Sequence, residues 1–237
     1  MTRRFGPFAL IMPAANLVPL IGVLAWGWDA FVLLMLYWLE TAVIAFWSVA
    51  RIATLPRDAI ADFDIDAARP PPSPPALAAI VSLNAGLFMA VHFLILWELF
   101  AGGWSQRIHG IGDFVQQLVI GTGLWLPLLA LFIARGAPML LDRAEPRLRQ
   151  TFGLRPGAGA RQSVLEPGET LVLVLGLYIR IVVMQVAIIF GAAVALLAGN
   201  AGALTVLIAV KTAVDLSSQT IADRFHAAWR KAKAASK

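Results

Sequence analysis

The sequence contains no cysteine, only three histidines and few charged residues, which make up 14% of the 237 positions. Without cysteine, disulfide bonds, thiolate metal ligands and thiol catalysis are excluded. The scarcity of charge excludes an ordinary soluble domain, in which about a quarter of the residues are charged. The chain is instead predicted to lie in a membrane.

Hydrophobic residues make up 59% of the chain and occur in unbroken stretches rather than on one face of amphipathic segments. A helix needs about 20 apolar residues to cross a bilayer. Six stretches satisfy or approach this length and predict an all-α, polytopic transmembrane helix bundle within residues 1–222, with inner loops at 54–76 and 134–170. The predicted spans are Phe5–Trp26, Trp28–Ala53, Leu77–Phe100, Phe114–Ile133, Leu171–Ala198 and Leu204–Leu216.

Lysine and arginine accumulate on the cytoplasmic side of membrane proteins, so their distribution indicates orientation. With the N-terminus inside, sixteen of the nineteen Lys and Arg residues fall on the inner side. Arg107 alone falls in an outer loop, while Arg180 and Lys211 fall within spans. The pattern predicts six spans in the inner (cytoplasmic) membrane, with both termini in the cytoplasm and a basic cytoplasmic tail at 223–237.

The net charge of +5 does not indicate a nucleic-acid-binding protein, because the basic residues are spread over the inner loops rather than gathered on one patch. Anionic lipid at the inner face is the expected partner. Phe225 and Trp229 lie four residues apart beside Arg230 and Lys231, as in an interfacial helix. The sequence leaves open whether the chain also assembles with a second copy or with a partner membrane subunit.

An alternative exists for the first span, because Arg3 and Arg4 precede its apolar run as in an export signal. Pro13 and Pro19 instead suit a kinked span that packs on neighbouring helices. We therefore favour a retained membrane helix.

Four charged residues are predicted at or near the centre of the bilayer. At about 1.5 Å per residue, Glu40 lies about 18 Å from the outer end of the second span, and Arg180 lies about 16 Å from the inner membrane boundary near Glu169. Asp215 lies about 16 Å from the outer end of the sixth span, one turn beyond Lys211. An unpaired charge at this depth costs at least about 2.5 to 3.5 kcal/mol, so the four side chains are expected to face one another inside the bundle.

A second polar layer is predicted nearer the outer face. His92 lies nearer the outer end of its span, at a depth similar to that of Gln185. Glu98 lies among tryptophans, where an aromatic belt would bring it into contact with water. Together with the central charges, these residues predict a polar pathway for an ion or small ligand from the outer face to the midplane.

Structural interpretations compete with this pathway. The Glu40–Arg180 pair can serve only to fix helix register. His92 alone is more typical of a hydrogen-bonded core residue than of a metal ligand. Lys211 and Asp215 can form a simple pair within one helix.

Three segments resemble the signature segments of an uncharacterised family of multi-pass prokaryotic membrane proteins, which is marked by Tyr-Trp-Leu-Glu. They are residues 33–47, which contain this motif, residues 86–100 and residues 178–216. The resemblance implies matching positions at Glu40, His92, Arg180, Lys211 and Asp215, but no activity. Members of that family often carry histidine where this chain has Gln185. The departure argues against a metal or haem site built from two histidines, and the sequence identifies no cofactor.

Enzyme classes are disfavoured by missing motifs. His-Glu-x-x-His and the glycine-rich loop with lysine are both absent, and Asp215 is the only membrane aspartate. Acid–base chemistry on a lipid headgroup by His92 and Glu98 is the remaining enzymatic alternative. We favour a small transporter or a membrane protein that binds an ion or small polar ligand. The alternative is a non-catalytic scaffold or accessory subunit of a membrane complex.

Overall fold

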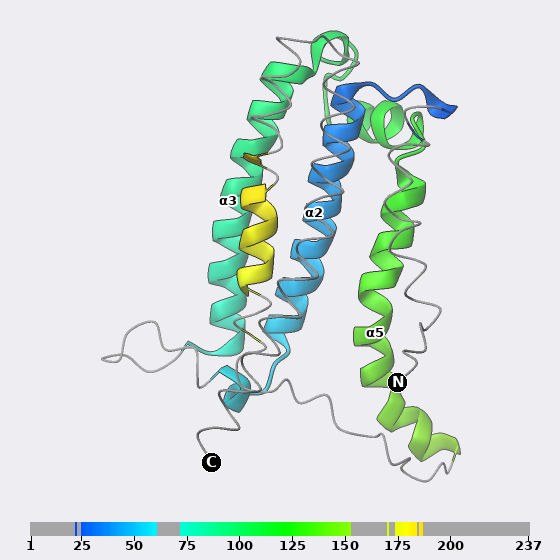
Figure 1. Ribbon diagram of the computed structural model, residues 1–237. Coiled ribbons are helices and arrows are strands. Elements are labelled where there is room, and N and C mark those ends of the chain that lie inside the picture. The colour runs from blue at the N-terminus through cyan, green and yellow to red at the C-terminus, as the bar shows by residue number, and fades with distance from the viewer. Residues whose placement is uncertain are drawn as a thin grey trace, which may run out of the picture. The chain divides into compact units, whose positions relative to one another are not determined.

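The structure is a computed structural model that describes residues 22, 25–60, 72–152, 170, 174–183, 185 and 186. Every regular element within these residues is helical, and no strand occurs among them (Figure 1). The elements are α2 (Ala30–Ala53), η1 (Arg57–Ile60), α3 (Pro74–Phe100), η2 (Gly102–Trp104), α4 (Ile111–Asp113), the π-helix η3 (Phe114–Ile120), α5 (Trp125–Phe152) and a shorter helix at Val174–Val183.

Two of these helices, α2 and α3, are long and apolar enough to cross a membrane. Helix α2 begins at Ala30 because Asp29 caps it: the backbone N–H of Val32 donates to Asp29 Oδ1 at 2.8 Å. Helix α3 begins at Pro74, where a proline suits the first turn because its missing N–H would have no partner there. Both predicted spans are therefore confirmed as helices, with starts shifted by two or three residues.

The predicted span over Phe114–Ile133 is not one continuous helix. The chain breaks after Ile120, and the helical segments Ile111–Ile120 and Trp125–Leu140 meet at 92°. Gly123 has φ of +81°, a left-handed conformation that glycine adopts without steric penalty. Helix α5 then continues beyond Ile133 to Phe152, so the first half of the predicted loop 134–170 is helical.

The described residues fall into two units, each with its own packing. The first contains residues up to Leu39, Val91–Pro127 and those from Val182 onward, and the second contains Glu40–Ala90 and Leu128–Ile181. In the first unit, the α2 residues from Ala30 to Tyr37 are buried on every face. An apolar helix that is covered all round forms the core of its unit.

In the second unit, α2 packs on two sides. On one side, Ile52 joins a core with Leu77 and Val81 of α3 and with Leu177 and Ile181 of the Val174–Val183 helix. Figure 1 shows this helix, in yellow, beside α3. On the other side, the α2 ring of Trp47 lies 5.0 Å from the ring of Phe132 in α5. Aromatic side chains therefore fill the space between α2 and α5.

Large apolar side chains also cover the outside of the helices. Exposed residues of α3 recur every three or four positions, as they would along one helical face, and α5 and the Val174–Val183 helix show the same pattern. The exposed α3 side chains are Ile80, Leu83, Leu87, Val91 and Leu94. Such a surface is unfavourable in water and suits a hydrocarbon solvent.

Only part of the predicted six-span bundle falls within the described residues. The described residues contain two candidate spans, or three if the bent pair Ile111–Ile120 and Trp125–Leu140 counts as one. Of the predicted first span, Phe5–Trp26, only residues 22, 25 and 26 are described. The predicted fifth span is described only in its first half, and residues 204–216 lie outside the described part.

Candidate functional site

Two helices bring opposite charges together in the second unit. The guanidinium of Arg180 donates from Nη2 to Glu40 Oε2 at 3.3 Å and from Nε to Thr41 Oγ1 at 3.3 Å. The Glu40 and Arg180 side chains are 14% and 26% exposed, and Thr41 is 2% exposed. The predicted pairing of Glu40 with Arg180 is confirmed, and Thr41 joins it.

The helical repeat explains how these side chains meet. Glu40 and Thr41 are neighbours in α2, so two adjacent side chains can reach the same guanidinium. Arg180 follows the buried Leu177 by three residues and precedes the buried Ile181 by one. Residues three apart share a helix face, so Arg180 lies at the edge of the face that packs into the core. Because the surrounding helices are apolar, the pair neutralises two charges that would be costly alone.

Thr41 was not singled out by its sequence, although it follows Glu40 directly. Its hydroxyl is the buried acceptor that turns a simple ion pair into a two-point contact with Arg180. A polar residue adjacent to a charge in an apolar run is the signal that would have identified it.

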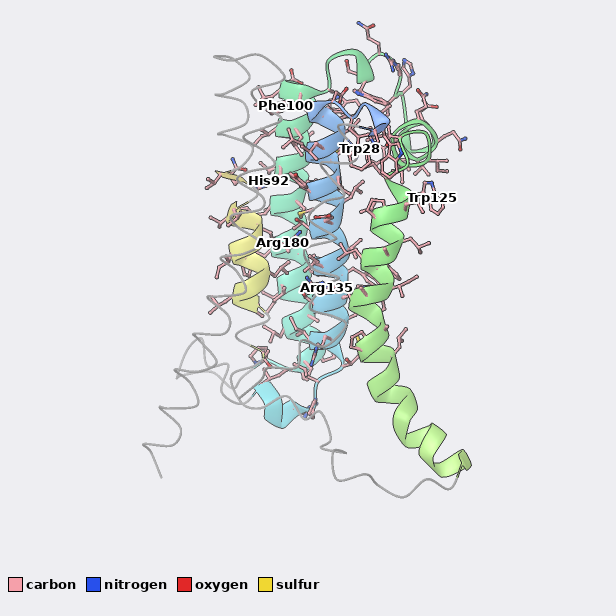
Figure 2. All side chains as sticks on the ribbon, turned by 45° about the vertical axis from the view of Figure 1, so that its right-hand side comes forward. Trp28, His92, Phe100, Trp125, Arg135 and Arg180 are labelled. Carbon is pink, nitrogen blue, oxygen red and sulfur yellow. The ribbon has the colours of Figure 1, made fainter. Side chains whose placement is uncertain are left out.

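His92 lies in the first unit, where it is 4% exposed on the buried face of α3 (Figure 2). Met89 and Leu96, three residues before and four after, are buried on the same face. Gln185 also belongs to this unit, and its Oε1 is buried without a hydrogen-bond donor among the described residues. Two polar side chains of the predicted second layer are thus partly or wholly covered.

Glu98 does not share the buried face of His92. It is exposed on α3, as are Leu94 and Leu99. The structure therefore does not bring Glu98 together with His92. The expected contact of Glu98 with water stays a prediction.

Lys211 and Asp215 lie outside the described residues, as does the tail at 223–237. Within the described part of the chain, no group of three or more His, Asp or Glu side chains could hold a metal ion. The described residues therefore provide an ion pair with a hydroxyl and, in the other unit, a buried histidine.

A network at the start of α2 was also missed. Asp29 accepts a hydrogen bond from the indole N–H of Trp104 through Oδ2 at 2.8 Å, while its Oδ1 caps the helix. The indole N–H of Trp28 donates to the carbonyl of Thr122 at 2.9 Å. An aspartate immediately before an apolar run is the sequence signal of a helix cap and could have revealed Asp29.

Comparison with curated proteins gives no match, and neither does comparison with solved structures. A family model matches residues 3–237, nearly the whole chain. The chain belongs to a family of unknown function, DUF6498.

Proposed function

We propose that this chain is a multi-pass membrane protein that binds an ion or small polar ligand within its helix bundle. The observation that carries the proposal is the distribution of side chains: leucine, isoleucine and valine occupy the exposed face of α3, while the ion pair and His92 are inside their units. Water-soluble proteins place charge outside and apolar residues inside. The reverse arrangement supports a lipid environment.

The topology that we propose has six spans in the inner membrane, with both termini in the cytoplasm. The excess of basic residues in the inner loops and in the tail at 223–237 supports it. We expect these residues to contact anionic lipid headgroups. The transmembrane bundle would extend over 1–222.

The proposed binding site centres on Glu40 and Arg180, which the second unit brings together. From the sequence we expect His92, Gln185, Lys211 and Asp215 to contribute to the same pathway. A carboxylate and a guanidinium in contact present both signs of charge to a ligand in a medium of low dielectric constant. Ionisable residues within membrane spans commonly line ion or proton pathways. Glu98, exposed near the end of α3, would mark the water boundary of this pathway.

A transport assay with protons as the probe tests this function. The full chain is reconstituted in liposomes that contain a pH-sensitive dye, and a pH gradient is imposed. We expect proton flux above that of empty liposomes, and a lower flux for His92→Ala and for Glu40→Gln. Asn84→Ala is the matched control, because Asn84 is a polar but exposed residue of α3.

Two outcomes contradict the proposal. Equal flux in protein-containing and empty liposomes would remove proton transport and favour the scaffold alternative. Equal flux in the wild type, His92→Ala and Glu40→Gln, with all three folded, would remove these residues from the pathway.

A further inference from the structure

The chain between α3 and α5 forms a short helix, Ile111–Ile120, which we call the connecting helix. One face of it is anchored to the first unit. Leu118 is buried, and the Phe114 ring meets that of Phe93 in α3 edge-on, at 6.1 Å between centroids. Gln117 Nε2 donates to the carbonyl of Arg107 at 2.9 Å. These contacts fix which face of the connecting helix points away from the protein.

The face that points away is apolar. Ile111, Val115 and Ile120 are 86%, 44% and 48% exposed. Three large aliphatic side chains on ten residues form a continuous stripe if they share one face. In water this stripe would be unfavourable, because apolar surface is driven out of contact with water.

The π-helical turn of η3 brings Ile120 onto the same face as Val115. The N–H of Gly121 donates to the carbonyl of Gln116 at 3.0 Å, five residues earlier, as in a π-helix. Residues five apart therefore lie nearly above one another, and Val115 and Ile120 are five apart. In an α-helix, at about 100° per residue, the same two side chains would diverge by about 140°.

The connecting helix runs perpendicular to α5. The two meet at 92°, and Figure 2 shows the connecting helix nearly end-on while α5 is seen from the side. The bend is held by the hydrogen bond from Trp28 Nε1 to the Thr122 carbonyl. If α5 crosses the bilayer, a helix at a right angle to it lies along the membrane surface.

Aromatic and polar side chains near the connecting helix match an interface between lipid and water. Trp125, at the start of α5, is 44% exposed, and tryptophan is enriched at the headgroup level of membranes. The guanidinium of Arg107 lies over the Trp104 ring at 5.3 Å, and Gln116 is exposed beside the apolar stripe. Polar groups thus flank the stripe, as they do in helices that lie in the membrane plane.

We propose that the connecting helix lies flat in one interface of the bilayer, with Ile111, Val115 and Ile120 inserted at the boundary between headgroups and acyl chains. A lipid surface fits this stripe better than a protein partner. Stable protein interfaces use about 20 to 30 residues on each side, whereas the stripe has three. The proposal rests on the membrane location proposed above, but not on ligand binding.

The absence of cysteine from the chain permits a direct test by site-directed spin labelling. Single cysteines are introduced as Ile111→Cys, Val115→Cys and Ile120→Cys, and each is labelled with a nitroxide in the full chain, reconstituted in phosphatidylcholine liposomes. Collision rates are measured with oxygen, which concentrates among acyl chains, and with a water-soluble nickel chelate. We expect the ratio of oxygen to nickel collisions at the three positions to be several-fold higher than at Gln116→Cys, the matched exposed control.

A label at Leu87→Cys, on the exposed face of α3, separates failure of this proposal from failure of the membrane location. If Leu87→Cys reports acyl chains while the three stripe positions report water, the interfacial proposal is overturned and the membrane location stands. If Leu87→Cys also reports water, both are overturned. Dipolar broadening at Val115→Cys that disappears on dilution with unlabelled chain would assign the stripe to a second copy and would also overturn the proposal.

Discussion

At the scale of single residues, the charge inside the apolar helices was the most informative feature of the sequence. The cost of an isolated charge in hydrocarbon predicted that Glu40 needs a basic partner, and Arg180 fills that role. The cost of burying a charge identifies the Glu40–Arg180 pair, but it does not identify the hydroxyl of Thr41. A hydroxyl costs far less to bury than a charge, and its position is therefore weakly constrained by sequence.

The Glu40–Arg180 pair should stabilise the fold, and a double-mutant cycle measures by how much. Glu40→Gln leaves Arg180 without its anionic partner, and we expect a loss of about 2 to 3 kcal/mol, somewhat below that of a fully buried pair. The double variant Glu40→Gln, Arg180→Gln should recover at least half of this loss, because no unpaired charge remains. Thermal unfolding in detergent, followed by circular dichroism, gives the comparison.

The control for this cycle is Glu98→Gln, the same chemical change at an exposed position of α3. It should alter stability by less than about 0.5 kcal/mol. If Glu40→Gln is as stable as Glu98→Gln, or if the double variant is no better than the single, the pair contributes nothing to the fold.

At the scale of helices, the sequence predicted α2 and α3 closely and the fourth span poorly. Long apolar runs bounded by Asp29 and by the prolines near Pro74 leave little freedom in where a helix lies. Between Phe114 and Ile133 apolar residues predominate, so composition alone indicates one span, although Gly121 and Gly123 interrupt the run. The break depends on the backbone of Gly123 and on a hydrogen bond from Trp28, which is distant in sequence. Hydropathy does not report either of these.

Glycine also permits a close helix contact, at Gly136 of α5. A Cβ at this position would collide with the ring of Trp47 in α2, whereas a Cβ at Gly86 of α3 would meet nothing within 4 Å. We expect Gly136→Ala to destabilise the protein by about 1 to 3 kcal/mol through overpacking. Gly86→Ala, the matched control, should stabilise the protein by up to about 1 kcal/mol, because alanine loses less conformational freedom than glycine when the chain folds into a helix.

Thermal unfolding of the two alanine variants in detergent distinguishes the effects of packing and of helix propensity. If the collision with Trp47 causes the loss, Trp47→Leu combined with Gly136→Ala should be less destabilised than the sum of the single changes. Equal stabilisation by both alanines would mean that α5 does not approach α2 at Gly136.

At the scale of the whole molecule, the apolar exterior indicates the environment of the helices, whereas the distribution of basic residues indicates their direction across the membrane. The exposed aliphatic face of α3 supports a hydrocarbon environment but carries no information on direction. The basic residues indicate direction but not depth. The sequence therefore supplies the direction and the further spans, because most of the predicted first span and of the last two lies outside the described residues.

Labelling from either side of the membrane tests the direction of α3. This helix has 27 residues and is about 40 Å long, more than the thickness of the hydrocarbon core, so its two ends should lie on opposite faces. In the cysteine-free chain, we expect Ser105→Cys, after α3, to react with an impermeant maleimide in right-side-out vesicles, and Arg57→Cys, before α3, to react only in inside-out vesicles. Reaction of both from the same side would mean that α3 does not cross. A reversed pattern would retain the crossing and overturn the cytoplasmic placement of the termini, because each further span alternates from the side on which α3 begins.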